Sequence, residues 1–305
     1  MSFLSFVIEK YFKIKGFKKS FLKKPKDDFM DYIKDSNRDT KRKIDPDDVK
    51  IKSSLSEFYI ENMQTFIINE KNNIDQKVIL YLHGGAYLSD PVIFHYRACD
   101  KLARSLNAKV IFPIYPKASL HTYDETYRLL DILYEKILEN NKDISIIGDS
   151  AGGGLALGFA MYLRDKEKSL PKDLILYSPW LDLNCDNPKI KDYEKLDPML
   201  SAWGLEKIGR MWAGCDPFSG KCVNIDHPYL SPINGDFTNL SKISIFVGTH
   251  EIFLPDCMKL HEILNKKGID HNFFVKEKMN HVYPIYPMKE GHEALSKTAK
   301  IIDNL

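Results

Sequence analysis

A serine stands in a glycine-rich turn near the middle of the chain, in the stretch Gly148-Asp149-Ser150-Ala151-Gly152, which fits the pattern GxSxG. An apolar run of strand length (143–148) precedes the turn, and a small-residue helical pattern (151–166) follows it. In this context a serine can be a nucleophile, because small residues on either side let a strained turn fit between strand and helix. We therefore predict that Ser150 attacks an acyl group, if the chain also supplies a base, an acid and an oxyanion hole.

Phosphate binding at this turn and metal-assisted hydrolysis fit the sequence less well. A Walker loop needs lysine after its last glycine, but Gly153 is followed by Gly154, and the dinucleotide fingerprint GxGxxG has Leu157 where its last glycine belongs. A zincin motif HExxH begins at three His-Glu pairs, but its second histidine is replaced each time, by Leu254, Asn265 and Ser296. We expect no metal and no organic cofactor.

An oxyanion hole is predicted at a second turn, His83-Gly84-Gly85-Ala86, which follows the apolar run 77–82. Amide groups aimed in advance at the developing negative charge stabilise the transition state by about 3 kcal/mol per donor. We expect the N–H groups of Gly84, Gly85 and Ala151 to supply them.

The base and the acid are expected after the serine, at the carboxyl ends of later strands. His281 lies in a loop that follows the strand-like run 271–277, whereas the other histidines considered lie in helical patterns, at a strand start or in an irregular stretch (His261, His292, His271 and His227). For the acid we favour Glu251, just beyond the run 242–248. Asp256 is the alternative, although its place before a helical pattern suggests a helix N-cap.

The pattern of elements predicts a single α/β domain. Apolar runs alternate with helical patterns, which is typical of a mostly parallel sheet covered by helices on both faces. The runs are 77–82, 108–115, 143–148, 173–178, 242–248 and 271–277, preceded by a hairpin at 58–69, and the helices fall at about 95–106, 123–139, 151–166 and 256–267, with another at the end. We assign residues 51–180 and 236–305 to the catalytic core and residues 181–235 to an insertion over the strand ends.

The first fifty residues are expected to contribute to a lid. Residues 1–24 have apolar side chains at helical spacing and a lysine-rich face; we favour a helix whose apolar stripe packs on the protein, with weak peripheral membrane contact as the alternative. Residues 25–50 are dense in charge, which is typical of a mobile connection or a part of the lid.

Bulk properties exclude several classes of partner and fold. The formal net charge of +2 over 305 residues gives no global attraction to nucleic acid. Five scattered cysteines without a CxxC pair argue against a disulfide framework and indicate a reducing, cytoplasmic location. The N-terminal apolar run is short and its lysines follow it, so we expect neither a signal peptide nor a transmembrane helix.

Several segments between residues 55 and 305 resemble the hormone-sensitive lipase group of α/β-hydrolases. They are HGGA at 83–86, YPKASLHTY at 115–123, GDSAGG at 148–153, SPWLDL at 178–183 and MNH at 279–281. The resemblance implies the α/β-hydrolase fold, with a helical lid built from the N-terminus and from an insertion after the sixth strand. It also implies that His83 and Asp149 support the motifs rather than transfer protons.

The sequence departs from the pattern of this group in two places. Ala86 stands where the group has the third glycine of HGGG, which would narrow the acyl groups or alcohols accepted. Glu251-Ile252-Phe253 stands where the group has Asp-Pro-Leu, so the acid would be a glutamate.

The predicted function is the hydrolysis of small carboxylic esters, of short to medium acyl chains, through an acyl-enzyme intermediate. An amidase, peptidase or deacylase would use the same triad, and a non-catalytic ligand-binding protein could share the fold.

Overall fold

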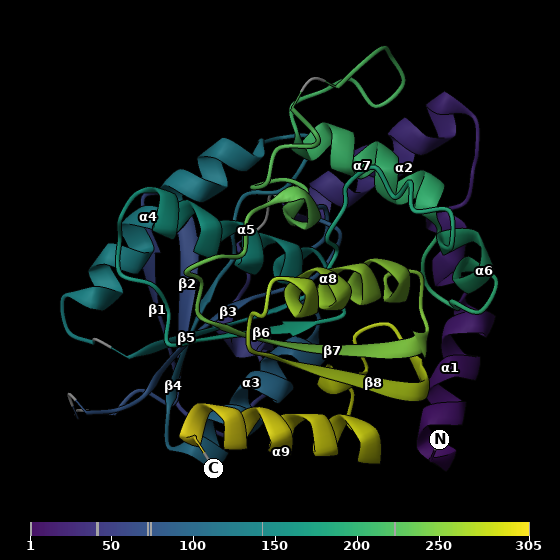
Figure 1. Ribbon diagram of the computed structural model, residues 1–305. Helices are drawn as coiled ribbons and strands as arrows, with labels where there is room; N and C mark the ends of the chain where they lie inside the picture. Colours follow the sequence, from purple (N-terminus) through teal and green to yellow (C-terminus); the bar gives the residue numbers. More distant parts are fainter. Residues whose placement is uncertain are drawn as a thin grey trace.

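One twisted eight-stranded sheet forms the centre of the computed structural model, which describes residues 2–40, 43–71, 73, 75–141, 143–222 and 224–304, with side chains for all of these except 37–40 (Figure 1). The strand order is β1-β2-β4-β3-β5-β6-β7-β8. β1 pairs antiparallel with β2, β2 antiparallel with β4, and all other neighbours are parallel. The strands are β1 (Leu55–Ile60), β2 (Met63–Ile68), β3 (Val78–Leu82), β4 (Lys109–Pro113), β5 (Ile144–Asp149), β6 (Asp173–Tyr177), β7 (Lys242–His250) and β8 (His271–Asn280).

Helices cover both faces of the sheet, and this explains why its strands are apolar on both sides. In β3, Ile79 and Tyr81 face one hydrophobic cluster while Leu80 and Leu82 face the other, because successive side chains point to opposite faces. The first cluster includes α3 (Ile93–Leu106) and α9 (Lys289–Asp303), and the second includes α4 (Tyr123–Leu138), α5 (Ala151–Asp165) and α8 (Leu254–Lys266). The predicted α/β-hydrolase architecture is thus confirmed.

A further helical layer combines the N-terminal segment with the insertion between β6 and β7. It contains α2 (Lys26–Thr40), α6 (Ile190–Glu194) and α7 (Ala202–Trp212). Phe29 of α2 is completely buried, and its ring lies 5.3 Å from that of Trp203 in α7. The expectation of a mobile connection at 25–50 is therefore wrong for α2, because Phe29 and Ile33, four residues apart, give this charged helix one buried face. We call α2 and residues 181–235 together the cap.

The N-terminal helix α1 (Phe3–Lys15) is shorter than expected and packs differently. It ends at Gly16, whose φ of 67° is left-handed, and a 3₁₀ turn, η1 (Phe17–Ser20), follows. Its buried residues are Ser5 and Phe12, while most of its large apolar side chains are exposed. The interpretation that its apolar stripe packs on the protein holds for Ile8 and Phe12, which contact the cluster that includes α3 and α9. It is wrong for the other apolar side chains of the stripe, which are exposed: Leu4, Val7, Tyr11 and Ile14. No helix in the described part of the chain is long and apolar enough to cross a bilayer.

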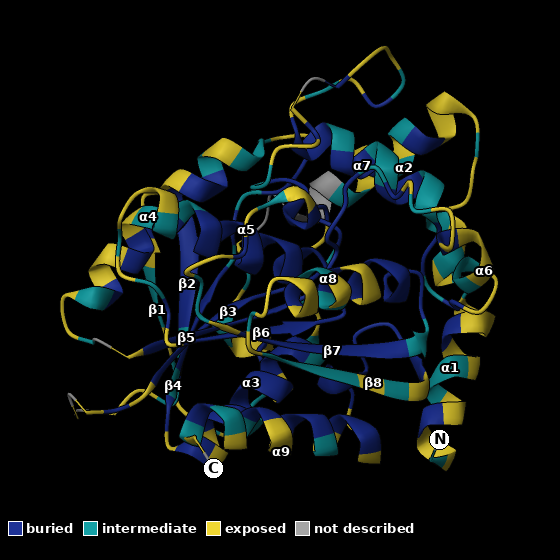
Figure 2. Cartoon of the chain, viewed as in Figure 1, coloured by how far each residue is buried: buried dark blue, intermediate teal, exposed yellow. Residues whose placement is uncertain are grey.

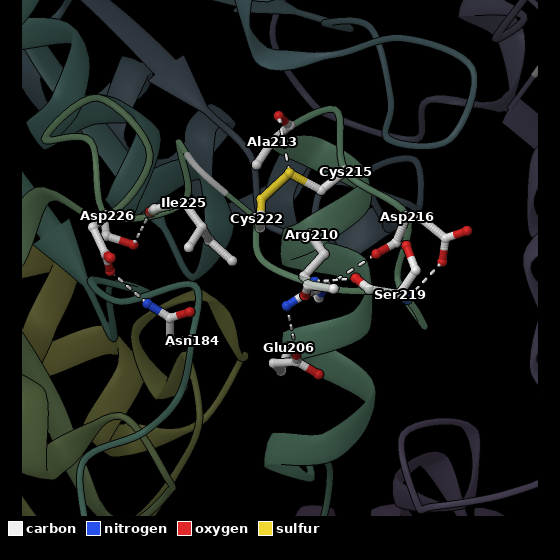
Figure 3. The surroundings of a disulfide bond; sticks show 12 residues. Asn184, Glu206, Arg210, Ala213, Cys215, Asp216, Ser219, Cys222, Ile225 and Asp226 are labelled. Atoms are coloured by element: carbon white, nitrogen blue, oxygen red, sulfur yellow. Dashed lines mark hydrogen bonds and ion pairs between the residues drawn. A yellow bond between two sulfur atoms is a disulfide. The ribbon is translucent and has the colours of Figure 1, made fainter.

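Two of the five cysteines form a disulfide, which corrects the expectation from their spacing. Cys215 and Cys222 are bonded across a short loop that follows α7 (Figure 3). The Arg210 side chain donates hydrogen bonds to the carbonyl oxygens of Asp216, Ser219 and Gly220 within this loop. Cys99, Cys185 and Cys257 are free and buried. The reducing, cytoplasmic location stays a prediction.

Candidate active site

Ser150 lies on a sharp turn between β5 and α5, as the GxSxG pattern predicts. Its φ of 54° and ψ of −121° are strained for a residue with a side chain, and its N–H donates to the carbonyl of Tyr177 at 2.8 Å. The turn also needs its flanking glycines. A Cβ on Gly148 would lie 2.2 Å from the carbonyl oxygen of Gly152, and one on Gly152 would lie 2.0 Å from that of Leu82.

The structure brings Ser150, His281 and Glu251 into one line of hydrogen bonds. Ser150 Oγ lies 2.8 Å from His281 Nε2, and His281 Nδ1 lies 2.8 Å from Glu251 Oε2. A carboxylate only accepts hydrogen bonds, so Nδ1 carries the proton and Nε2 is free to accept from the serine hydroxyl. All three residues are buried, and His281 follows β8 directly as Glu251 follows β7.

Ser178 connects the acid to the loop of the base. Its hydroxyl donates to Glu251 Oε1 at 2.8 Å and accepts from the N–H of Val282 at 3.0 Å. The N–H of Gly248 donates to the same carboxylate oxygen at 2.6 Å. One carboxylate oxygen is thus fixed by two donors while the other faces His281, which sets the orientation of the acid.

Asp256, the alternative acid, lies elsewhere. It is the third residue of α8, so it is not the N-cap that its sequence position suggested. One of its oxygens accepts from the Asn187 side chain at 2.7 Å, and burial raises the pKa of its carboxyl group. The structure does not bring Asp256 to His281.

A second buried carboxylate, Asp197 from the cap, supports the acid loop. It accepts backbone hydrogen bonds from Ile252, which follows Glu251, and from Met199 and Leu200. Burial raises the pKa of Asp197 to about 6, although the neighbouring His281 and these backbone hydrogen bonds oppose that rise. Asp197 therefore links the cap to the loop that carries Glu251.

The oxyanion loop is held by Asp149, which leaves some of its amides free. The N–H of Gly84 donates to Asp149 Oδ1 at 2.9 Å, and the Tyr81 hydroxyl donates to the same oxygen at 2.9 Å. Within the described part of the chain, the amides of Gly85 and Ala86 make no hydrogen bond. The predicted role of Gly84 as a donor therefore does not fit this arrangement, because its N–H is already bonded to a carboxylate.

His83 fixes the same loop from the other side. Its Nδ1 lies 2.6 Å from the carbonyl oxygen of Gly84, and its Nε2 lies 3.3 Å from the buried ammonium of Lys117. Since an ammonium only donates, Nε2 is the acceptor and Nδ1–H donates to Gly84. Burial, and then the charges of Lys117 and His95, hold the pKa of His83 well below its usual range. His83 is thus neutral, which suits the supporting role that the resemblance implies.

Lys117 is enclosed by acceptors. Its Nζ lies 2.6 Å from the carbonyl oxygen of Tyr115 and 3.6 Å from Asp90 Oδ1, in addition to His83. Burial lowers the pKa of Lys117 to about 8 despite the nearby carboxylate. The peptide that joins Gly84 to Gly85 is therefore oriented through His83 by a buried cation.

Some of these supporting residues lie in the motifs of the sequence, although the motifs alone assign them no role. Ser178 opens SPWLDL, and Tyr115 and Lys117 lie in YPKASLHTY. Asp197 lies in the insertion, where no pattern marks it. In the described residues, no group of three or more histidine, cysteine or acidic side chains could hold a metal ion.

Comparison with known proteins places this site in a family. The family model for the alpha/beta hydrolase fold matches residues 79–285, about two thirds of the chain. The chain belongs to this family of α/β-hydrolases, which is the fold that the resemblance of its motifs implies.

Individual relatives are similar over most of their length. An esterase from Acinetobacter venetianus is 28% identical over 234 residues, covering 75% of each chain. An acetyl-hydrolase from Streptomyces hygroscopicus is 29% identical, covering 72% of this chain and 73% of its own. A crystal structure of a candidate esterase from Staphylococcus aureus superposes with a TM-score of 0.85 at 31% identity, covering 92% of this chain and 94% of its own.

Proposed function

We propose that the protein is a serine carboxylesterase that uses Ser150, His281 and Glu251 as its catalytic triad. The observation that carries the proposal is the unbroken line of hydrogen bonds from Ser150 through His281 to Glu251, at 2.8 Å for both contacts. The names of the relatives, esterase and acetyl-hydrolase, support the same class of reaction.

The geometry gives each group a role in acyl transfer. Ser150 Oγ attacks the ester carbonyl carbon while His281 Nε2 takes the hydroxyl proton, and Glu251 stabilises the imidazolium that forms. The tetrahedral intermediate collapses, and the alcohol leaves with the proton from His281. Water then attacks the acyl-enzyme with His281 as the base, releasing the acid and restoring Ser150.

The oxyanion of the intermediate is assigned to three amides, those of Gly85, Ala86 and Ala151. The first two are unbonded among the described residues, and the amide of Ala151 belongs to the first residue of α5, where the helix offers it no acceptor. Ala86 replaces the group's third glycine at a φ of 55°, a conformation that glycine adopts more easily. Its methyl group adds bulk beside the hole, which favours short to medium acyl chains.

Replacement of the nucleophile tests the proposal. Ser150→Ala should lower kcat for p-nitrophenyl acetate about 10⁴-fold or more, because no other group can form the acyl-enzyme. Ser169→Ala changes an exposed serine remote from the motifs, and its kcat should equal that of the wild type. A fluorophosphonate probe should label the wild type on Ser150; near wild-type turnover in Ser150→Ala, or no labelling of the folded protein, would reject the proposal.

Matched substrates then separate the ester reaction from its nearest alternative. An amidase, peptidase or deacylase would use the same triad, so p-nitrophenyl esters and p-nitroanilides with the same acyl groups should be compared. We expect a large preference for the ester, and a series from acetate to octanoate should show its maximum at short to medium chains. Equal rates on the amide would shift the assignment to an amidase.

A further inference from the structure

The N-terminal helix is attached to the body along one side. Glu290 of α9 accepts hydrogen bonds from the N–H of Ser2 and from the hydroxyls of Ser2 and Ser5, the latter at 2.6 Å. Phe12, on the same side, packs its ring 5.4 Å from that of Tyr286. α1 is therefore a docked helix at the edge of the molecule, beside the end of β7, where Glu9 lies 3.6 Å from His250 (Figure 1).

Much of α1 is exposed (Figure 2), and many of its exposed side chains are apolar. Of the fifteen large hydrophobic side chains that are exposed in the described residues, eight lie in residues 3–22: Phe3, Leu4, Phe6, Val7, Tyr11, Ile14, Phe17 and Leu22. Phe3 and Ile14 are each 83% exposed. At 100° per residue, Phe3, Val7 and Ile14 fall on one stripe of the helix, opposite Ser5 and Phe12. A soluble protein normally covers such a patch, so it marks an interaction surface.

The charge around this stripe identifies the partner. Residues 2–24 contain seven lysines and a single glutamate, although the chain as a whole is nearly neutral. Glu9 is paired with Lys13, and Lys18 points toward the cap, where its ammonium donates to the carbonyl of Asp197. Lys10 and Lys15 lie beside the apolar stripe, over the rings of Phe6 and Tyr11. Aromatic and aliphatic side chains flanked by lysines suit the interface of an anionic bilayer.

A basic hollow continues this surface onto α9. It has a volume of about 770 Å³, and Leu4 of α1 lines it together with Lys289 and Lys297 of α9. Glu293 also lines it, but is bonded to Lys276 at 2.8 Å. Lipid phosphates beside an inserted α1 would thus meet further lysines of the same face.

We propose that α1 and the adjoining end of α9 form a docking surface for anionic lipid membranes. α1 lies in the plane of the interface, with Phe3, Val7 and Ile14 in the acyl region and the lysines at the headgroups. The surface does not use the triad, so it is independent of the esterase proposal.

Vesicle sedimentation tests the proposal with the full chain. Two kinds of vesicle are compared, one of phosphatidylcholine alone and one that also contains about 30% phosphatidylglycerol. The fraction of wild-type protein that sediments should be at least about tenfold larger with the anionic vesicles, and it should fall at high salt. The triple variant Phe3→Ser/Val7→Ser/Ile14→Ser and the charge variant Lys10→Gln/Lys15→Gln should each lose most of this binding.

A matched control removes exposed apolar side chains elsewhere. Ile132→Ser/Val275→Ser/Met258→Ser changes residues that are 41%, 45% and 41% exposed, and it should bind vesicles like the wild type. Circular dichroism and p-nitrophenyl acetate turnover check that each variant is folded. Equal recovery of the wild type with and without vesicles, or a stripe variant that binds as well as the control, would overturn the proposal. The proposal would also be overturned if the wild type formed a stable dimer that the stripe variant does not form, and if the wild type did not sediment with vesicles. A second copy of the chain would then cover α1.

Discussion

The carboxylate of Glu251 is fully buried and bonded through both oxygens, to His281 on one side and to Ser178 and Gly248 on the other. Glu251→Gln keeps the shape of this side chain but removes the negative charge that would stabilise the imidazolium in the proposed triad. Its amide nitrogen can also turn toward His281 and donate to Nδ1, which would leave Nε2 protonated and unable to take the serine proton. We expect kcat for p-nitrophenyl acetate to fall about 10³- to 10⁴-fold with the fold intact.

Asp256 provides the control for this prediction. Asp256→Asn preserves the size of a side chain that bonds Asn187, so turnover should stay within a few-fold of the wild type. The assignment of the acid would be reversed if Asp256→Asn abolished turnover while Glu251→Gln retained it.

Lys117 predicts a pH-dependent contribution to stability. Its pKa in the folded protein is about 8, below the 10.5 of an exposed lysine. Between these values the unfolded chain holds a proton that the folded protein has released, so stability rises with pH through this window and is lost as pH falls through 8. Across this window the free energy of unfolding changes by at most about 3 kcal/mol through Lys117.

Comparison with Lys117→Met isolates this contribution, because other titrating groups are common to both proteins. Urea unfolding at pH 7, 8.5 and 10 should show the wild type gaining stability relative to the variant as pH rises. A difference that does not change with pH would show that Lys117 titrates as an exposed lysine.

The loop closed by Cys215 and Cys222 follows α7 and contacts α2. Phe218 in this loop lies 5.8 Å from Phe29. Closing this loop lowers the conformational entropy of the unfolded chain, which stabilises the folded protein by about 2.5 kcal/mol at 25 °C. We expect dithiothreitol to lower the Tm of the wild type by several degrees. The variant Cys215→Ser/Cys222→Ser should have the lower Tm without reductant and show no response to it; a reductant response equal in both proteins would contradict the prediction.

The sequence identified the strands and the loops that carry Ser150, Glu251 and His281 because the relevant signals are local. Apolar runs such as 77–82 mark buried strands, and a residue that follows a strand directly lies at its carboxyl end. Contacts made across the fold gave no such signal: the partner of Gly84 is Asp149, and the partner of Ile252 is Asp197. Amphipathic spacing predicted that α1 is a helix but not which side faces the protein, because hydrophobicity alone does not distinguish a core from a lipid interface.

The cap contacts the loops that carry Glu251 and His281 and a residue that follows the oxyanion loop. Asp197 bonds the loop of Glu251, and Met199 contacts Asn280, which precedes His281. Trp212 stacks at 4.4 Å on Tyr87, which follows the oxyanion loop. Lys18, after α1, donates to the carbonyl of Asp197. The N-terminal segment and the insertion therefore act on the site as one layer, and their packing should limit the acyl chains that fit beneath it.

Phe29→Ala tests this limit, since it removes the buried ring that joins α2 to Trp203 and Phe218. The cavity should cost about 3–5 kcal/mol, most of it in the attachment of α2. With the cap loosened, the ratio of kcat/KM for p-nitrophenyl octanoate to kcat/KM for p-nitrophenyl acetate should rise at least about threefold. Phe66→Ala is the matched control, because this ring is equally buried but lies in β2 against Tyr96, away from the cap. If both variants changed the ratio equally, general loosening of the fold rather than the cap would set the acyl preference.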